Sequence, residues 1–176
     1  PDLKATFAFT VTVPEHWMVL SNEPVAERAA AGDGRTRWTF PPTPRISSYI
    51  TAVCAGPYVG VTDSYTGRGA EIPLGVYARK SLADYVDHDN ILDCTKAGIG
   101  FLEEEFDMPF PFAKYDQIFV PEYNAGAMEN AGCVTITDIY VFRGQAPEPL
   151  VERRALTILH ELAHMWFGDL VTMQWW

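Results

Sequence analysis

Apolar and polar residues alternate along the first part of the chain in a way that predicts short β-strands. Residues 3–13 (LKATFAFTVTV) alternate and are rich in Thr, Val and Phe, which favours a strand. The same pattern predicts further strands at 17–20, 35–40 and 50–61. Residues 27–34 are rich in alanine and punctuated by glycine, so we expect a connection there. The first part of the chain, to about residue 65, is therefore predicted to be all-β.

The pattern changes after residues 67–73, a weak boundary that contains glycines, charges and a proline. Apolar residues at helical spacing predict a helix over 87–107, whose start Asp87 or Asp89 can cap. Short apolar runs predict strands at 74–78, 114–121, 133–137 and 139–142. Because strands and helices are mixed without βαβ regularity, we expect an α+β fold.

A second helix is predicted at 149–168, and its residues carry the strongest chemical signal. Pro149 suits the first helical position, and Gly168 suits the left-handed stop after the end. Residues three and four apart predict one apolar stripe, made of Leu156, Leu159, Leu162, Ala163 and Trp166. His160 and His164 stack on another face, and Glu161 projects to the side of that pair.

Two imidazoles one helical turn apart can bind the same zinc ion through ring nitrogens. Glu161 is then placed to take a proton from a water that the zinc activates. The alternative is a surface helix with two unrelated histidines, but the helical context and the apolar opposite face count against it.

The third ligand decides the subclass of zinc site. Phe167 and Leu170 stand where metzincins place a glycine and a third histidine, so that class is excluded. Other zincins use a Glu from a following helix, yet Asp169 is the one carboxylate after His164. Either the parent protein continues beyond Trp176, or the pattern is not a working zinc site.

A second constellation lies between two predicted strands, at residues 122–132 (EYNAGAMENAG), where small residues surround Glu129. A structural loop could have this composition too. Beside a zinc helix, however, an extended substrate can pair with an exposed strand edge, and a carboxylate there can hold a cationic group. If that cation is a free α-amino group, only the first peptide bond reaches the metal.

Composition limits the remaining function classes. The chain has 23 acidic against 13 basic residues, a net charge of −10, which argues against a nucleic-acid surface. No apolar run is long enough to span a bilayer. The three cysteines, Cys54, Cys94 and Cys133, form no C-x-x-C pair, so we expect buried reduced thiols in a cytoplasmic protein.

The two constellations together resemble the zinc aminopeptidases of the aminopeptidase N type. The resemblance rests on GAMEN at 126–130 and HELAHMWFG at 160–168, about thirty residues apart. It extends to 1–7, 42–47, Tyr115-Asp116 and 170–173, and so covers nearly the whole chain.

The resemblance implies one zinc ion bound by His160 and His164, with Glu161 as the general base. The substrate-lining residues that it implies are Gly126, Ala127, Met128, Glu129 and Asn130, and Glu129 would bind the α-amine of a peptide with a free N-terminus. It also implies the C-terminal part of a saddle-shaped β domain (1–72), followed by the first half of a thermolysin-like domain (73–176). The third zinc ligand and a transition-state tyrosine are expected beyond Trp176, so the segment alone is expected to be inactive.

Within enzymes, the alternative is a thermolysin-like endopeptidase without an amine anchor. From another class, the alternative is a folded piece that acts only as a scaffold or binding surface.

Overall fold

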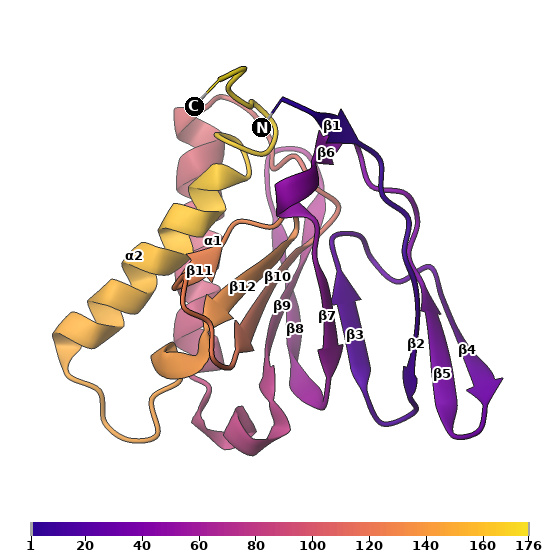
Figure 1. The fold of residues 1–176 in the computed structure, drawn as a ribbon. Helices are drawn as coiled ribbons and strands as arrows, with labels where there is room; N and C mark the ends of the chain where they lie inside the picture. Colours follow the sequence, from indigo (N-terminus) through magenta and orange to yellow (C-terminus); the bar gives the residue numbers. More distant parts are fainter. Residues whose placement is uncertain (1, 176) are drawn as a thin grey trace.

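A computed structural model describes residues 2–175 and shows a mixed α+β fold (Figure 1). Its centre is a sheet whose strands are ordered β11-β12-β10-β9-β8. These strands are β8 (Tyr58–Thr66), β9 (Glu71–Arg79), β10 (Tyr115–Val120), β11 (Ala127–Met128) and β12 (Cys133–Thr137). β10 runs parallel to β9 and to β12, whereas β8 and β11 run antiparallel to their neighbours. The expected α+β class is confirmed.

The two long helices, α1 (His88–Glu105) and α2 (Glu148–His164), pack on one face of this sheet. The core between helices and sheet includes Val76 on β9 and Leu162 on α2, both fully buried. A Cβ on Gly98 would lie 2.5 Å from a methyl carbon of Leu159, so this glycine lets α1 approach α2 closely. Short 3-10 helices η2 (Lys80–Tyr85) and η3 (Asp138–Tyr140) connect the elements.

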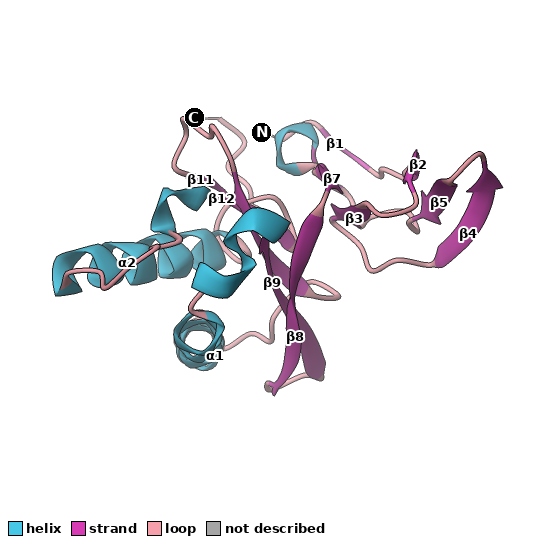
Figure 2. Cartoon of the chain, turned by 90° about the horizontal axis from the view of Figure 1, so that it is seen from below, coloured by secondary structure: helices cyan, strands magenta, loops and turns pink. Residues whose placement is uncertain are grey.

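The opposite face of the sheet is covered by β-ribbons from the first part of the chain (Figure 2). The ribbon that lies directly on it is the antiparallel pair β3 (Met18–Ser21) and β7 (Val53–Gly56). Beyond it, β2 (Thr10–Pro14), β5 (Arg35–Thr39) and β4 (Glu27–Gly32) form a three-stranded sheet. β1 (Lys4–Ala5) pairs with β6 (Ile46–Ser47), and the 3-10 helix η1 (Ser48–Ile50) follows β6.

Most predicted strands are present, but several predictions need correction. The strand predicted at 50–61 is two strands, β7 and β8, which belong to different sheets. Residues 27–34 are not a mere connection: 27–32 form β4, which pairs with β5, and the chain turns at Asp33 and Gly34 with positive φ. The predicted strand at 139–142 is wrong, since η3 occupies 138–140. The strand predicted at 3–13 is two separate strands, β1 and β2.

The predicted junction near Ile72 falls inside β9, which runs through residues 71–79. β8, on its N-terminal side, is hydrogen-bonded to β9 and belongs to the same sheet as β10 and β12. No helix among the described residues is long and apolar enough to cross a bilayer.

Candidate metal centre and substrate loop

Helix α2 brings both motif histidines to one place, as their spacing predicts. The Nε2 atoms of His160 and His164 lie 3.2 Å apart. The Nδ1 atom of His164 lies 3.0 Å from the Phe167 carbonyl oxygen. If Nδ1 carries the proton that this carbonyl accepts, Nε2 keeps its lone pair for a metal. The two imidazoles therefore fit a zinc ion bound through Nε2 of each.

The rest of α2 differs from its sequence prediction. Helix α2 runs from Glu148 to His164, so Pro149 is its second residue rather than its first, and Gly168 lies four residues after its end rather than just past it. The predicted apolar stripe is only partly buried: Leu162 and Trp166 lie in the core, whereas Leu156 is 69% exposed and Leu159 is 36% exposed. The buried face instead contains Arg154, Ile158, Glu161 and Leu162.

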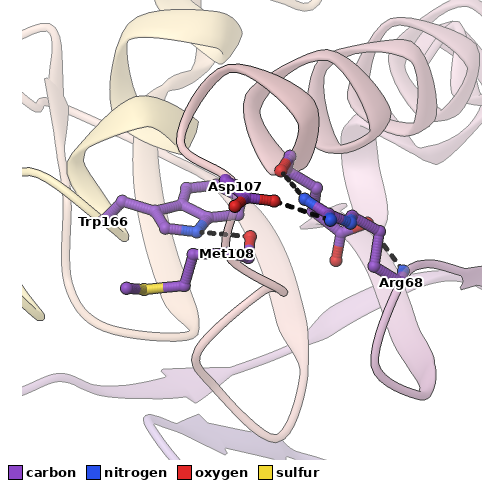
Figure 3. A network of polar contacts seen from close by, with 5 residues as sticks. Arg68, Asp107, Met108 and Trp166 are labelled. Atoms are coloured by element: carbon purple, nitrogen blue, oxygen red, sulfur yellow. Dashed lines mark hydrogen bonds and ion pairs between the residues drawn. The ribbon is translucent and has the colours of Figure 1, made fainter.

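The end of α2 is held in place through the indole ring of Trp166. Its Nε1 donates a hydrogen bond of 3.2 Å to the Met108 carbonyl oxygen, just after α1 (Figure 3). On the other side of that segment, Arg68 donates from Nη2 to Asp107 at 2.7 Å and from its backbone N to the buried Glu103 carboxylate at 2.9 Å. The segment after α1 thus connects the β8–β9 turn to the residue that lies two positions after His164.

Glu161 is 5% exposed, although it follows an exposed histidine in the sequence. Burial, and to a smaller extent the nearby charge of Glu129, raise the pKa of its carboxyl to about 7, with His164 acting in the opposite direction. A carboxyl group with a pKa near neutrality can both accept and return a proton.

The loop at 126–130 lies against this helix. Its residues Ala127 and Met128 form β11, the end strand of the central sheet, so one edge of β11 pairs with no strand among residues 2–175. A cleft of about 320 Å³ runs between that edge and α2, and its lining includes Gly126, Ala127, His160 and Glu161. The exposed edge predicted from the sequence is therefore present, and it faces the two motif residues.

Glu129 completes a group of side chains that could bind a cation. One ligand atom each from Glu129, Glu161 and His164 lies within 4.8 Å of the others. A second pocket, of about 100 Å³, is lined by Tyr49, Glu129, His164 and Gly168 among others. The carboxylates of Glu129 and Glu161 lie close enough for their charges to repel, which favours a bound cation between or beside them.

Two residues from the first part of the chain reach this site, and the sequence reasoning missed both. Tyr49 on η1 donates a hydrogen bond from its hydroxyl to the Glu129 carboxylate, and burial together with that negative charge raises the pKa of the phenol to about 12. Lys4 donates from Nζ to the Asp169 carbonyl oxygen at 3.1 Å. No local pattern in the sequence indicates that either residue belongs to the site, because only the tertiary fold brings them there.

Asp169 is the one residue with a side-chain carboxylate between the end of α2 and Trp175, and it is nearly fully buried. Neither of its carboxylate oxygens has a hydrogen-bond partner among the described residues. Burial, together with the charges of Glu129 and Glu161, raises the pKa of this carboxyl to about 8, and Lys4 acts in the opposite direction. It is not one of the residues that group with His164 around a possible metal position.

The far end of the loop that contains residues 126–130 is anchored to the ribbon beneath it through the amide of Asn22. Its Nδ2 donates at 2.9 Å to the carbonyl oxygens of Ile50 and Ala131, and its Oδ1 accepts from the Ala52 backbone N at 2.9 Å. Gly132 has φ +66°, and a Cβ there would lie 2.8 Å from the Asn22 carbonyl oxygen. A glycine is therefore required at this contact.

Comparison with known proteins gives one consistent result. Residues 91–176 match the Peptidase family M1 domain, and residues 1–50 match the Peptidase M1 N-terminal domain. The whole chain is 57% identical over 176 residues to the aminopeptidase N of Streptomyces lividans, of which it covers 20%. It is 36% identical over 180 residues to the aminopeptidase N of Mus musculus, of which it covers 18%. A puromycin-sensitive aminopeptidase of Caenorhabditis elegans is 37% identical over 180 residues, with 18% covered. The chain thus spans about a fifth of the length of these relatives.

Proposed function

Since the chain belongs to peptidase family M1, we propose that it is the part of a zinc aminopeptidase that carries two zinc ligands, a general base and the anchor for the substrate's α-amine. The observation that carries the proposal is the convergence of His160, His164, Glu161 and Glu129 at the unpaired edge of β11. The histidines and Glu161 lie on α2, and Glu129 lies just after β11.

The residues have distinct roles in this proposal. His160 and His164 hold the zinc, and a third protein ligand is expected beyond Trp176. A zinc ion supplies polarisation of the scissile carbonyl and a more acidic water. Glu161 takes the proton of the attacking water and passes it to the leaving amine. The backbone of Gly126, Ala127 and Met128 pairs with the extended peptide, and Asn130, which is buried and donates to the Thr135 hydroxyl at 3.2 Å, steadies the loop.

Glu129 binds the substrate's ammonium rather than completing the zinc site. A third zinc ligand has to lie close to both imidazoles, whereas Glu129 groups with His164 and Glu161 and not with His160. Its carboxylate also accepts the Tyr49 hydrogen bond, which orients it towards the pocket that it lines with His164. With the amine held there, the peptide bond that reaches the metal is the first one.

The same proposal includes the domain organisation and the cellular location of the protein. Residues 1–72 would belong to the C-terminal part of a saddle-shaped β domain, and 73–176 to the first half of a thermolysin-like domain. The two family matches leave residues 51–90 uncovered, and the junction would fall within that interval. A cytoplasmic location would suit the three cysteines, all of which are free thiols.

The test compares substrates with free and blocked amines on the natural, full-length protein. We expect zinc-dependent hydrolysis of aminoacyl anilides and of peptides with a free N-terminus, lost on chelation and restored by zinc. N-acetylated versions of the same peptides should be poor substrates. Equal cleavage of both versions at internal bonds would indicate an endopeptidase instead, and no zinc-dependent hydrolysis of either would leave only the scaffold role.

A further inference from the structure

Two of the three cysteines lie in the interface between the ribbon and the central sheet, on the face of the sheet opposite the helices. Cys54 lies on β7 of the ribbon, and Cys133 lies on β12 of the central sheet. Both belong to the apolar cluster between ribbon and sheet, in which Leu20 and Ala52 of the ribbon pack against Tyr77 and Ile118 of the sheet. Cys133 is fully buried, and Cys54 is partly exposed.

The two thiols are in direct contact and have unequal properties. Cys133 donates its S–H to the Cys54 sulfur, and this hydrogen bond is the main reason that the pKa of Cys54 lies below its usual value. The Lys114 ammonium acts in the same direction on Cys54, while burial opposes both. Donation of that hydrogen bond and full burial hold the pKa of Cys133 well above its usual value. The accessible thiol is thus the better nucleophile.

We propose that Cys54 and Cys133 form a thiol–disulfide exchange site that accepts a low-molecular-mass disulfide as its oxidant. The Cys54 thiolate attacks one sulfur of the reagent, so that a mixed disulfide forms and one reagent thiolate leaves. Cys133 then loses its proton to solvent and attacks the Cys54 sulfur, which releases the second reagent thiolate. Two protein thiols are oxidised to one disulfide, and one reagent disulfide is reduced to two thiols.

The positions of Cys54 and Cys133, on two β layers packed face to face, are compatible with a disulfide bond between them. A disulfide can join two β layers packed face to face, as the inter-sheet bridge of immunoglobulin domains does. Sulfurs that already share a hydrogen bond need only a local adjustment to close to about 2.05 Å. The backbone N of Cys133 donates at 2.8 Å to the Asn130 carbonyl oxygen, so the bond would form directly behind the substrate loop.

Cys94 provides a matched control inside the same chain. It lies on α1 and packs against the core on the other face of the central sheet. Burial raises the pKa of its thiol, and the three cysteines of the chain leave it no thiol partner on its own side. The proposal therefore requires Cys94 to remain a thiol under conditions that oxidise the other two.

The experiment uses the natural, full-length protein, fully reduced and then freed of reductant. The folded protein is incubated with glutathione disulfide, quenched with acid, alkylated and mapped by mass spectrometry. We expect a peptide pair cross-linked between Cys54 and Cys133 that has lost two hydrogens, and an alkylated Cys94. An alkylated Cys54 and Cys133 after prolonged incubation would overturn the proposal, as would a cross-link that contains Cys94.

Single substitutions separate the two steps. In Cys133→Ser the reaction should stop at a glutathionyl group on Cys54, whereas in Cys54→Ser the buried Cys133 should stay unmodified. Cys94→Ser should form the disulfide at the rate of the unsubstituted protein. A Cys133→Ser protein that gains no glutathionyl group while remaining folded by circular dichroism would rule out Cys54 as the attacking thiol. If a variant does not fold, the presence or absence of the Cys54–Cys133 cross-link in the unsubstituted protein still tests the proposal.

Discussion

The Tyr49 hydroxyl donates a hydrogen bond to the Glu129 carboxylate, and so joins the β-rich first part of the chain to the loop before β12. The contact is supported from below, because the Ala131 backbone N donates to the Ile50 carbonyl oxygen at 3.3 Å and Asn22 bridges the same two residues. The proposed amine anchor is therefore held by a residue that lies 80 positions away along the chain. The sequence places one loop and one helix at the site, and the structure adds Tyr49 of η1 as a third part of its lining.

Tyr49→Phe should weaken the binding of free-amine substrates without removing catalysis. The phenyl ring still lines the pocket. The Glu129 carboxylate, however, loses a hydrogen bond, and a hydrogen bond to a charged group contributes about 1.5–3 kcal/mol. We expect KM for an aminoacyl anilide to rise roughly tenfold or more while kcat changes little. Tyr85→Phe, at a tyrosine that is 46% exposed, is the matched control. An unchanged KM would show that Glu129 is oriented without Tyr49.

Glu129→Gln should chiefly damage the cleavage of substrates that carry a free amine. The substitution keeps the size of the side chain and removes the charge that makes a carboxylate–ammonium contact strong. We expect kcat/KM for free-amine peptides to fall by about two orders of magnitude or more, while slow cleavage of N-acetylated peptides is unaffected. A uniform loss on both substrate classes would mean that Glu129 supports the site in some other way.

Glu161→Gln should abolish activity and leave the zinc bound. Gln fills the same buried position, but it cannot accept a proton, and a positioned general base contributes about 10²–10⁴ in rate. His160 and His164 are untouched, so the zinc content measured by atomic absorption should match that of the unsubstituted protein. Substantial turnover with zinc retained would contradict the proposed role of Glu161.

Asp169→Asn should stabilise the zinc-free protein, and increasingly so as the pH rises. The folded-state pKa of about 8 lies above the usual value of 3.8, so the folded protein binds more protons than the unfolded chain between these values. Stability of the unsubstituted protein must therefore fall as pH rises through this window. An asparagine carries no charge at any of these pH values, so its burial has no such pH-dependent cost.

The measurement is the free energy of unfolding in urea at several pH values between about 4 and about 8, with a chelator present. We expect the stability advantage of Asp169→Asn over the unsubstituted protein to grow to roughly 1–3 kcal/mol near the top of this range. Asp93→Asn, at an exposed carboxylate of α1, should show no such growth. Parallel stability curves for Asp169→Asn and the unsubstituted protein would disprove the assigned protonation.

Local patterns in the sequence predicted those helices and strands whose conformation follows from the spacing of their own apolar and polar residues. The apolar residues at helical spacing after Pro149 were sufficient to predict α2, and the alternation in Arg35–Thr39 was sufficient to predict β5. β4 was missed because alanines have little strand propensity, and its conformation comes from pairing with β5. Leu156 belongs to the predicted apolar stripe, but the spacing could not show that its exposed side chain borders the cleft beside His160. Tyr49 and Lys4 could not be found, since only the tertiary fold brings them to the site.

Residues 1–176 expressed alone should be inactive and should hold zinc poorly. Within the described part of this segment the two imidazoles lack a carboxylate that groups with both of them, while catalytic zinc sites use three protein ligands and a water. Burial and the charge of Glu129 raise the pKa of Glu161 to about 7, so a partly protonated Glu161 is a poor substitute ligand near neutral pH. The exposed side chains of Leu156, Phe167 and Val171 add an aggregation hazard beside the site.

The segment and the natural protein should be compared after the same dialysis, by zinc content and by hydrolysis of an aminoacyl anilide. We expect zinc well below one ion per chain and no turnover for the segment, with one ion and full activity for the natural protein. His164→Ala in the segment is the control for weak binding at α2, and it should remove what zinc remains. Stoichiometric zinc with turnover like that of the natural protein would show that residues 1–176 contain the third ligand, and Glu129 would then be the carboxylate to examine first, because it already lies beside His164.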